Sequence, residues 1–214
     1  MNLDRLAPHY QWIETVVFGQ QLQRARTAFI HEIGSPRRVL ILGEGNGRFL
    51  AQFLKAHPAA RVDCVEASAR MLALARRRVR SRAINFIQAD LMETELEPGS
   101  YDLIVTHFVL DFFDERTLPP LIEKLACAAT AKAQWLVADF CLPAGGWRRR
   151  RARLTIAMMY RFFRVAAGLE VQRLVDYSQW LREAQFGLVA EAISPNEMIR
   201  SQLWQRSPEP RNLL

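Results

Sequence analysis

Three glycines stand at alternate positions, Gly43, Gly45 and Gly47, directly after the apolar run 39–42. Glycine adopts positive φ at little steric cost and, having no Cβ, lets the backbone approach a ligand closely. We expect a helix from 46 to 56, whose free N–H groups and positive dipole end point at whatever occupies the turn. The spacing therefore predicts a ligand-binding loop between a strand and a helix.

Two acidic residues directly follow the next two predicted strands. Glu66 comes after the strand 61–65, where a carboxylate can accept hydrogen bonds from both hydroxyls of a ribose. Asp90 comes after the strand 84–89, where its carboxylate can accept from an adenine amino group while the N–H of Leu91 donates to the ring. Either acid alone fits a solvated loop or a helix cap equally well. Ligand-type features at three successive strand ends favour a nucleotide-like ligand.

These residues need a sheet to bring them together, and the chain alternates apolar strands with helices. The predicted strands are 38–43, 61–65, 84–89, 101–106 and 134–140. The helices predicted after the glycine loop are 46–56, 69–80, 118–129 and 176–185. Such alternation predicts a parallel sheet with helices on both faces and the ligand at the carboxyl ends of the strands. The last two apolar segments, 188–193 and 198–205, predict an antiparallel hairpin.

Composition narrows the class of protein. The 214 residues suit one α/β domain, half of them apolar and a quarter charged. No apolar run reaches the ~20 residues that cross a bilayer, and the start has no signal-peptide pattern, so we expect a cytoplasmic protein. Cys64, Cys127 and Cys141 form no CxxC pair, which indicates packing rather than a disulfide framework or a metal site.

The net charge of +7 comes mostly from arginine, with dense clusters at 76–82 and 148–153. The first closes a predicted helix, where cations interact favourably with the negative dipole end. The second belongs to the segment 147–163, in which arginines and aromatic residues mix. This segment is either a lid for an anionic or lipophilic acceptor, a contact with an anionic membrane surface, or an ordinary amphipathic helix with solvated arginines.

With the glycine turn, Glu66 and Asp90 in place, the chain resembles the class I S-adenosylmethionine-dependent methyltransferases over residues 37–206. The resemblance implies an α/β fold, a three-layer Rossmann-like sandwich around a mostly parallel seven-stranded sheet that ends in an antiparallel C-terminal hairpin. It also implies S-adenosylmethionine as cofactor. The residues expected to contact the cofactor are Gly43, Glu44, Gly45, Gly47, Glu66, Ala67, Asp90, Leu91 and Thr106.

We expect a single domain, 1–214, in four parts. They are an N-terminal helical cap at 1–35, a cofactor-binding core at 37–141, a substrate-side helical insertion at 143–186 and the hairpin at 188–206. The cap is similar to helices that close over the substrate in small-molecule members. The residues expected on the substrate side are Tyr10, Trp12, Phe18, Asp111 and Tyr160.

The end of the fourth strand, Thr106-His107-Phe108-Val109, lies where the transferable methyl group is found in the resembled family. Enzymes that methylate base or amide nitrogens often carry an Asn/Asp-Pro-Pro-aromatic run there. Its absence argues against nucleic acid as the substrate. His107 could act as a general base, because its unperturbed pKa lies near neutrality. We favour the alternative in which only its backbone lines the methionine part of the cofactor.

The expected function is methyl transfer from S-adenosylmethionine to a small-molecule or lipid-like acceptor, at oxygen, nitrogen or carbon. A nicotinamide dehydrogenase shares the strand, the turn and the ribose acid, but Arg48 stands where GxGxxG has its third glycine, and a terminal hairpin is foreign to that fold. The remaining alternatives are a non-catalytic protein that binds S-adenosylmethionine and, less favoured, an RNA methyltransferase.

Overall fold

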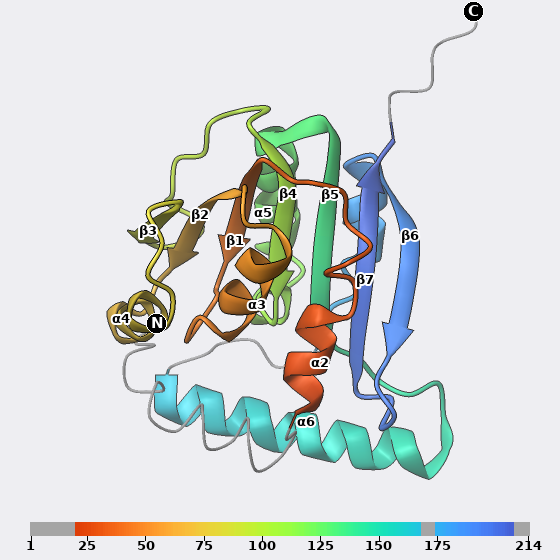
Figure 1. Ribbon diagram of the computed structural model, residues 1–214. Helices are drawn as coiled ribbons and strands as arrows, with labels where there is room; N and C mark the ends of the chain where they lie inside the picture. Colours follow the sequence, from red (N-terminus) through yellow and green to blue (C-terminus); the bar gives the residue numbers. More distant parts are fainter. Residues whose placement is uncertain (1–19, 168–173, 208–214) are drawn as a thin grey trace, which may run out of the picture.

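A computed structural model, which describes residues 20–167 and 174–207, contains a seven-stranded sheet in the order β3-β2-β1-β4-β5-β7-β6 (Figure 1). The strands are β1 (Arg38–Leu42), β2 (Arg61–Glu66), β3 (Ile84–Gln88), β4 (Tyr101–His107), β5 (Ala129–Phe140), β6 (Phe186–Ile193) and β7 (Ile199–Arg206). Strands β1 to β5 pair in parallel, and β7 pairs antiparallel with both β5 and β6. The predicted mostly parallel sheet with an antiparallel C-terminal hairpin is confirmed.

Helices cover both faces of this sheet. They are α2 (Gln21–Thr27), α3 (Arg48–Ala56), α4 (Ala69–Arg78), the 3₁₀ helix η3 (Leu110–Phe112), α5 (Leu118–Ala128), α6 (Gly146–Ala167) and α7 (Ser178–Glu183). In Figure 1, α2 and α3 lie in front of the sheet and α5 lies behind it. The result is a three-layer α/β sandwich.

The alternation of side chains along β1 explains the two cores. Val39 and Ile41 pack with α3, whereas Leu40 and Leu42 pack with α5 on the opposite face. All four are at most 2 % exposed, as expected for a central parallel strand that is covered on both sides.

The largest correction to the predicted elements is β5, which begins at Ala129 rather than at residue 134. The run Ala-Thr-Ala-Lys-Ala has weak strand propensity, but Ala129 pairs with Tyr101 of β4, and this pairing outweighs the local preference. The helix predicted at 176–185 shortens to α7, and the hairpin strands shift by one or two residues. The N-terminal positions Tyr10, Trp12 and Phe18 lie outside the described residues.

Two further predictions have mixed outcomes. Cys64 is buried as expected, but Cys127 is exposed, so the assignment of the cysteines to packing was wrong for Cys127. In the part of the chain that is described, no helix combines the length and apolar character needed to span a membrane.

Helix α6 lies across the carboxyl ends of the parallel strands (Figure 1). Its buried residues Ala152, Ile156 and Tyr160 join a separate cluster with Phe108, which directly follows β4, and Ile199 of β7. The carboxyl edge of the sheet is thus enclosed between the loops that follow the strands and this long helix.

Candidate functional site

The glycine loop joins β1 to α3 with positive φ at all three glycines, 63° at Gly43, 70° at Gly45 and 81° at Gly47. A Cβ built on Gly47 would lie 2.8 Å from Cα of Ala75 in α4, so this glycine allows two helices to meet. A Cβ built on Gly45 would meet nothing within 4 Å. Gly45 therefore presents open backbone, as a ligand cradle requires.

Glu66, the last residue of β2, ties the loop to the neighbouring strand. Its Oε2 accepts a hydrogen bond from the N–H of Gly45 (3.0 Å), and its Oε1 accepts one from the N–H of Ser68 (2.9 Å). The side chain is only 6 % exposed. Its carboxylate is consequently held at the bottom of the gap between the ends of β1 and β2.

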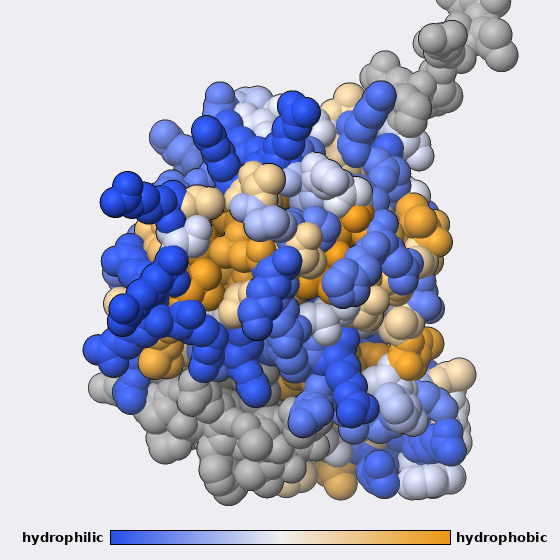
Figure 2. Space-filling model, viewed as in Figure 1, coloured by the Kyte–Doolittle hydropathy of each residue, from blue (hydrophilic) through white to orange (hydrophobic). Residues whose placement is uncertain are grey.

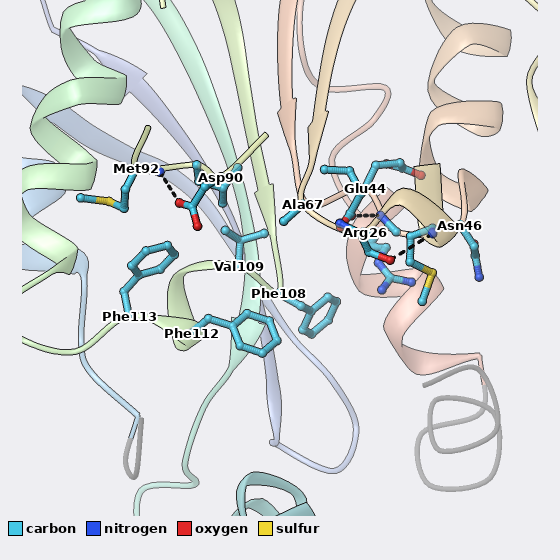
Figure 3. A pocket seen from close by; sticks show the side chains of 16 residues that line it. Arg26, Glu44, Asn46, Ala67, Asp90, Met92, Phe108, Val109, Phe112 and Phe113 are labelled. Carbon is cyan, nitrogen blue, oxygen red and sulfur yellow. Dashed lines mark hydrogen bonds between the residues drawn. The ribbon is translucent and has the colours of Figure 1, made fainter. Parts of the chain in front are cut away.

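Glu44 and Arg26 form the second charged feature. Oε1 of Glu44 accepts the N–H of Leu50 (3.0 Å) in the first turn of α3, and burial raises the pKa of Glu44 to about 7, an effect that the positive charge of Arg26 opposes. Arg26, from α2, is 9 % exposed and lies with its guanidinium carbon 5.1 Å from the ring centroid of Phe108. Figure 3 shows Arg26 and Glu44 on the same side of the cavity.

Asp90 follows β3 at the opposite end of the cavity (Figure 3). Its Oδ1 accepts the N–H of Met92 (2.9 Å), and its carbonyl accepts both the N–H and the hydroxyl of Thr94. Lys124 of α5 donates to the carbonyls of Leu91 (3.1 Å) and Met92 (2.7 Å). These bonds fix the backbone of the turn while leaving Asp90 on the cavity rim.

An aromatic wall formed by Phe108, Phe112 and Phe113 closes the cavity on the β4 side (Figure 3). Phe108 has φ of 57°, which is rare for a residue with a bulky side chain. Its N–H donates to the carbonyl of Ala138 on β5 (2.7 Å), which offsets part of the cost of this conformation. This left-handed residue turns the chain from β4 into η3 and so places the wall.

The cavity enclosed by these groups has a volume of about 260 Å³. Its lining residues are Arg26, Gly43, Glu44, Gly45, Asn46, Glu66, Ala67, Ser68, Met71, Asp90, Leu91, Met92, Phe108, Val109, Phe112 and Phe113. Seven of the nine residues expected to contact a cofactor are among them. The structure thus brings together the glycine turn and both strand-end acids, as the sequence predicted.

Two of the expected cofactor residues do not line the cavity. Gly47 faces α4 instead, as its distance to Ala75 shows. Thr106 is fully buried, and its hydroxyl accepts a hydrogen bond from the indole N–H of Trp135 (2.9 Å). The side chain of Thr106 therefore belongs to the core between β4 and β5.

His107 also lies behind the cavity rather than in its lining. Its ring is 7 % exposed and packs edge-on against Phe49 with ring centroids 4.6 Å apart. Burial, and to a smaller extent the charge of Arg26, lowers its pKa well below the ordinary value. These surroundings give no support to a general-base role of the side chain, and the alternative in which only the backbone of His107 lines the cofactor stays a prediction.

Two of the residues expected on the substrate side, Asp111 and Tyr160, are deeply buried next to each other. Asp111 in η3 is 6 % exposed and Tyr160 in α6 is 2 % exposed, with the Tyr160 hydroxyl 3.5 Å from the carbonyl of Asp111. Burial raises the pKa of Asp111 to about 7, and that of Asp139 on β5 also rises, chiefly through burial and then through the charge of Asp111. The charge of one carboxyl thus opposes ionisation of the other, which favours a proton on one of the two.

Several lining residues escaped the sequence analysis. Arg26 belongs to no sequence motif that would place it at the site, because it reaches the cavity from a helix that is remote in sequence. Phe112 and Phe113 stand in the stretch that follows β4, so their proximity to the site was visible, but their orientation depends on the left-handed turn at Phe108.

Residues 39–131 match the family model described as a methyltransferase domain. The chain is 36 % identical over 86 residues to malonyl-[acyl-carrier protein] O-methyltransferase of Halalkalibacterium halodurans, covering 38 % of this chain and 32 % of that protein. It is 29 % identical over 127 residues to demethylmenaquinone methyltransferase of Thermus thermophilus, covering 56 % of this chain and 58 % of that protein. The chain thus spans less than two thirds of these relatives.

Solved structures share the fold over more of the chain. The methyltransferase in complex with the Trm112 activator from Haloferax volcanii gives a TM-score of 0.72 at 10 % identity and covers 98 % of both chains. The 1,6-didemethyltoxoflavin-N1-methyltransferase of Burkholderia thailandensis, solved with S-adenosylhomocysteine, gives 0.63 at 15 % identity and covers 94 % of this chain and 88 % of that one. The family model covers residues 39–131, and together with the sheet order and the glycine turn it supports a class I S-adenosylmethionine-dependent methyltransferase.

Proposed function

We propose that the cavity binds S-adenosylmethionine and that the enzyme transfers its methyl group to a small, lipid-like acceptor. The observation that carries this proposal is the convergence of Gly45, Glu66 and Asp90 on one cavity. The open side of Gly45 and the carboxylates at the ends of the cavity suit a ligand with a polar amino acid end, a ribose and an adenine ring.

The residues present divide naturally among the parts of this cofactor. Glu66 uses its oxygens on two backbone N–H groups, and each oxygen keeps a lone pair for a ribose hydroxyl. Asp90 and the backbone of Leu91 would read the adenine edge. Arg26 and Glu44, of opposite charge, would meet the carboxylate and the ammonium of the methionine end.

When bound, S-adenosylmethionine supplies an electrophilic methyl group on its sulfonium. The chain must then orient the acceptor and exclude water. The wall of Phe108, Phe112 and Phe113 serves both purposes, because its rings offer flat apolar surface and no competing nucleophile. The buried side chains of His107 and Thr106 take no part in this step.

The same wall favours an apolar or ring-containing acceptor over a charged one. Val109 and Met92 extend this apolar lining. The comparison with demethylmenaquinone methyltransferase is consistent with this choice, whereas the comparison with malonyl-[acyl-carrier protein] O-methyltransferase leaves a carboxyl oxygen as the alternative acceptor atom. The acceptor is therefore proposed as a class, lipid-like and small, rather than as one compound.

Isothermal titration with S-adenosylhomocysteine and with adenosine tests the cofactor site. We expect Arg26→Gln to weaken binding of S-adenosylhomocysteine roughly tenfold, since a charge-assisted hydrogen bond contributes about 1.5 kcal/mol. The same variant should leave adenosine binding unchanged, because adenosine lacks the amino acid end. Arg24→Gln, an exposed position on the same helix, is the matched control.

Transfer of a labelled methyl group tests the acceptor class. We expect incorporation into demethylmenaquinone but not into malonyl-[acyl-carrier protein] or RNA. Incorporation into either of the last two with none into the quinone contradicts the lipid-like acceptor while leaving the cofactor site intact. Binding of neither S-adenosylmethionine nor S-adenosylhomocysteine contradicts the proposal as a whole.

A further inference from the structure

Helix α6 has one buried and one exposed face. Ala152, Ile156 and Tyr160 point toward the sheet and are at most 5 % exposed. Trp147, Leu154 and Met158 are 65 %, 63 % and 64 % exposed. Positions i, i+7 and i+11 lie on one side of an α-helix, so these three residues form an apolar stripe directed away from the protein core.

Arginines flank this stripe. The sequence of α6 contains seven arginines and no acidic residue. Three near its start have partners: Arg148 pairs with Glu197 (2.6 Å), Arg149 bonds the carbonyls of Pro143 and Ala144, and Arg151 lies over the ring of Trp147. Arg150 and Arg153 are exposed.

The other arginine cluster provides a comparison within the same chain. At the end of α4, Arg76 bonds the carbonyl of Phe86 and lies over its ring, and Arg78 bonds the carbonyl of Asn46. None of the large, exposed apolar side chains in the described part of the chain belongs to α4. Basic charge alone therefore does not distinguish α6, whereas basic charge combined with an exposed apolar stripe does.

A polar hollow of about 300 Å³ continues the exposed face at the start of α6. The described residues that line it are Gln21, Trp147, Arg148, Arg151, Pro195, Asn196 and Met198. Two guanidinium groups beside an exposed indole suit a phosphate group that sits next to apolar chains, because arginine binds phosphate oxygens in pairs and tryptophan prefers the interface between water and lipid.

We propose that the outer face of α6 docks on an anionic membrane surface, with Trp147, Leu154 and Met158 entering the boundary between headgroups and acyl chains and the flanking arginines contacting lipid phosphates. A helix that lies in the membrane interface combines large apolar residues, which enter the boundary with the acyl chains, with arginines at the level of the headgroups. Charge complementarity selects the lipid: each arginine near an anionic surface contributes favourably, and the helix has no acid to oppose it.

The opposite face of α6 gives this docking a consequence for the reaction. That face packs in the same cluster as Phe108, whose ring lines the cavity. A docked helix would bring the aromatic wall close to the membrane, where a lipid-like acceptor dissolves. This consequence rests on the proposed acceptor class, whereas the docking itself does not.

Vesicle co-sedimentation tests the docking without cofactor or acceptor. We expect the full chain to bind vesicles of phosphatidylcholine mixed with phosphatidylglycerol, to bind phosphatidylcholine alone weakly, and to lose binding as salt rises. Arg150→Gln/Arg153→Gln should weaken binding roughly thirtyfold, since each arginine contributes about 1 kcal/mol. Leu154→Gln/Met158→Gln should weaken it at every salt concentration, because the apolar contribution is not screened.

The matched control is Arg77→Gln/Arg80→Gln, which removes the same charge from exposed positions in and just after α4. Equal losses in both arginine variants would overturn the proposal, since binding would then follow net charge. Absence of binding to anionic vesicles at low salt would also overturn it. A third contrary result is RNA binding that depends on Arg150 and Arg153 together with vesicle binding that is indifferent to Leu154 and Met158. Far-ultraviolet circular dichroism verifies that every variant is folded.

Discussion

The carboxyl edge of the sheet has two ends, one at β1 and β2 and the other at β4 and β5, and they differ in how their buried polar groups are hydrogen-bonded. Where β1 and β2 end, the carboxylates of Glu66 and Glu44 accept hydrogen bonds from backbone N–H groups. Where β4 and β5 end and β7 begins, Asp111, Asp139 and Tyr177 each keep a buried polar atom that has no hydrogen-bond partner among the described residues. The first end is electrostatically complete, and the second is not.

This difference follows from what each end has to do. In the function proposed above, the end of β1 and β2 holds the cofactor, and backbone N–H groups supply a fixed site there that tolerates changes of side chain. In the same proposal, the acceptor side of the edge is built from side chains of η3, β5 and α6, in which Asp111, Asp139 and Tyr160 lie. Buried polar groups without partners are rare in proteins and often mark sites of function.

The largest effect that would sharpen the comparison comes from two glycines in one loop. Gly47→Ala should destabilise the protein by about 3 kcal/mol, because the new Cβ meets backbone of Ala75 and φ is 81°. Gly45→Ala should cost only about 1 kcal/mol in stability, since its Cβ meets open space, but should weaken S-adenosylhomocysteine binding. Urea unfolding and calorimetric titration separate the two. Equal losses of stability would show that the loop has no open side.

The second prediction concerns Glu66. Glu66→Gln should weaken cofactor binding by about 2 kcal/mol, or roughly thirtyfold, because the amide group places a donor against the N–H of either Gly45 or Ser68. Glu97→Gln removes an exposed carboxylate that pairs with Arg38 and serves as the control. Titration with S-adenosylhomocysteine measures both. Unchanged affinity in Glu66→Gln would mean that this carboxylate does not organise the cofactor side.

These two tests concern the half of the site that could be predicted from the sequence. Several site residues could be recognised from the sequence because they follow apolar strands, and the carboxyl ends of parallel strands meet at one edge. They are Gly43, Gly45, Glu66 and Asp90. The family resemblance also implied the mostly parallel seven-stranded sheet and its antiparallel C-terminal hairpin. Local sequence patterns were therefore sufficient to predict the part of the site that is built mainly from backbone groups.

The other half depends on contacts that no local pattern encodes. Asp111 and Asp139 are 28 residues apart in the sequence (139 − 111) and meet only because η3 folds back over β5. Arg26 reaches the cavity from α2. Thr106 was assigned to the cofactor from the sequence, whereas its hydroxyl accepts a hydrogen bond from Trp135. Tertiary packing decided all three positions.

The third prediction uses the carboxyl pair to test this incomplete end. Burial is the main reason that the pKa of Asp111 rises to about 7 and that the pKa of Asp139 rises well above its ordinary value. Unfolded aspartates release their protons near pH 3.9, so between about pH 4 and 7 the folded state holds more protons than the unfolded state. Stability should therefore fall as pH rises through that window.

Asp139→Asn should flatten this decline by up to about 1.4 kcal/mol per pH unit, because the amide donates to Asp111 without a titrating proton. Urea unfolding across the window measures the slope. Glu32→Gln, at an exposed position, should leave the slope as it is in the unaltered protein. If the slope of stability against pH is unchanged in Asp139→Asn, the proton that the folded state holds does not belong to the Asp111–Asp139 pair. The two ends of the edge would then differ less in their buried charge.

The smallest effect is expected at His107, which lies between the two ends. Its ring packs against Phe49 and its pKa is lowered well below the ordinary value, so at neutral pH it is neutral and screened from the cavity. His107→Gln should change turnover less than about threefold, or ~0.6 kcal/mol, with the pH profile of turnover unmoved. Steady-state rates across pH, with S-adenosylhomocysteine affinity as the check on the site, measure this. A loss of turnover at unchanged cofactor affinity would make His107 a general base after all. The proton of the acceptor would then leave through the cofactor side of the edge, and the side chains of η3, β5 and α6 would serve only to bind the acceptor.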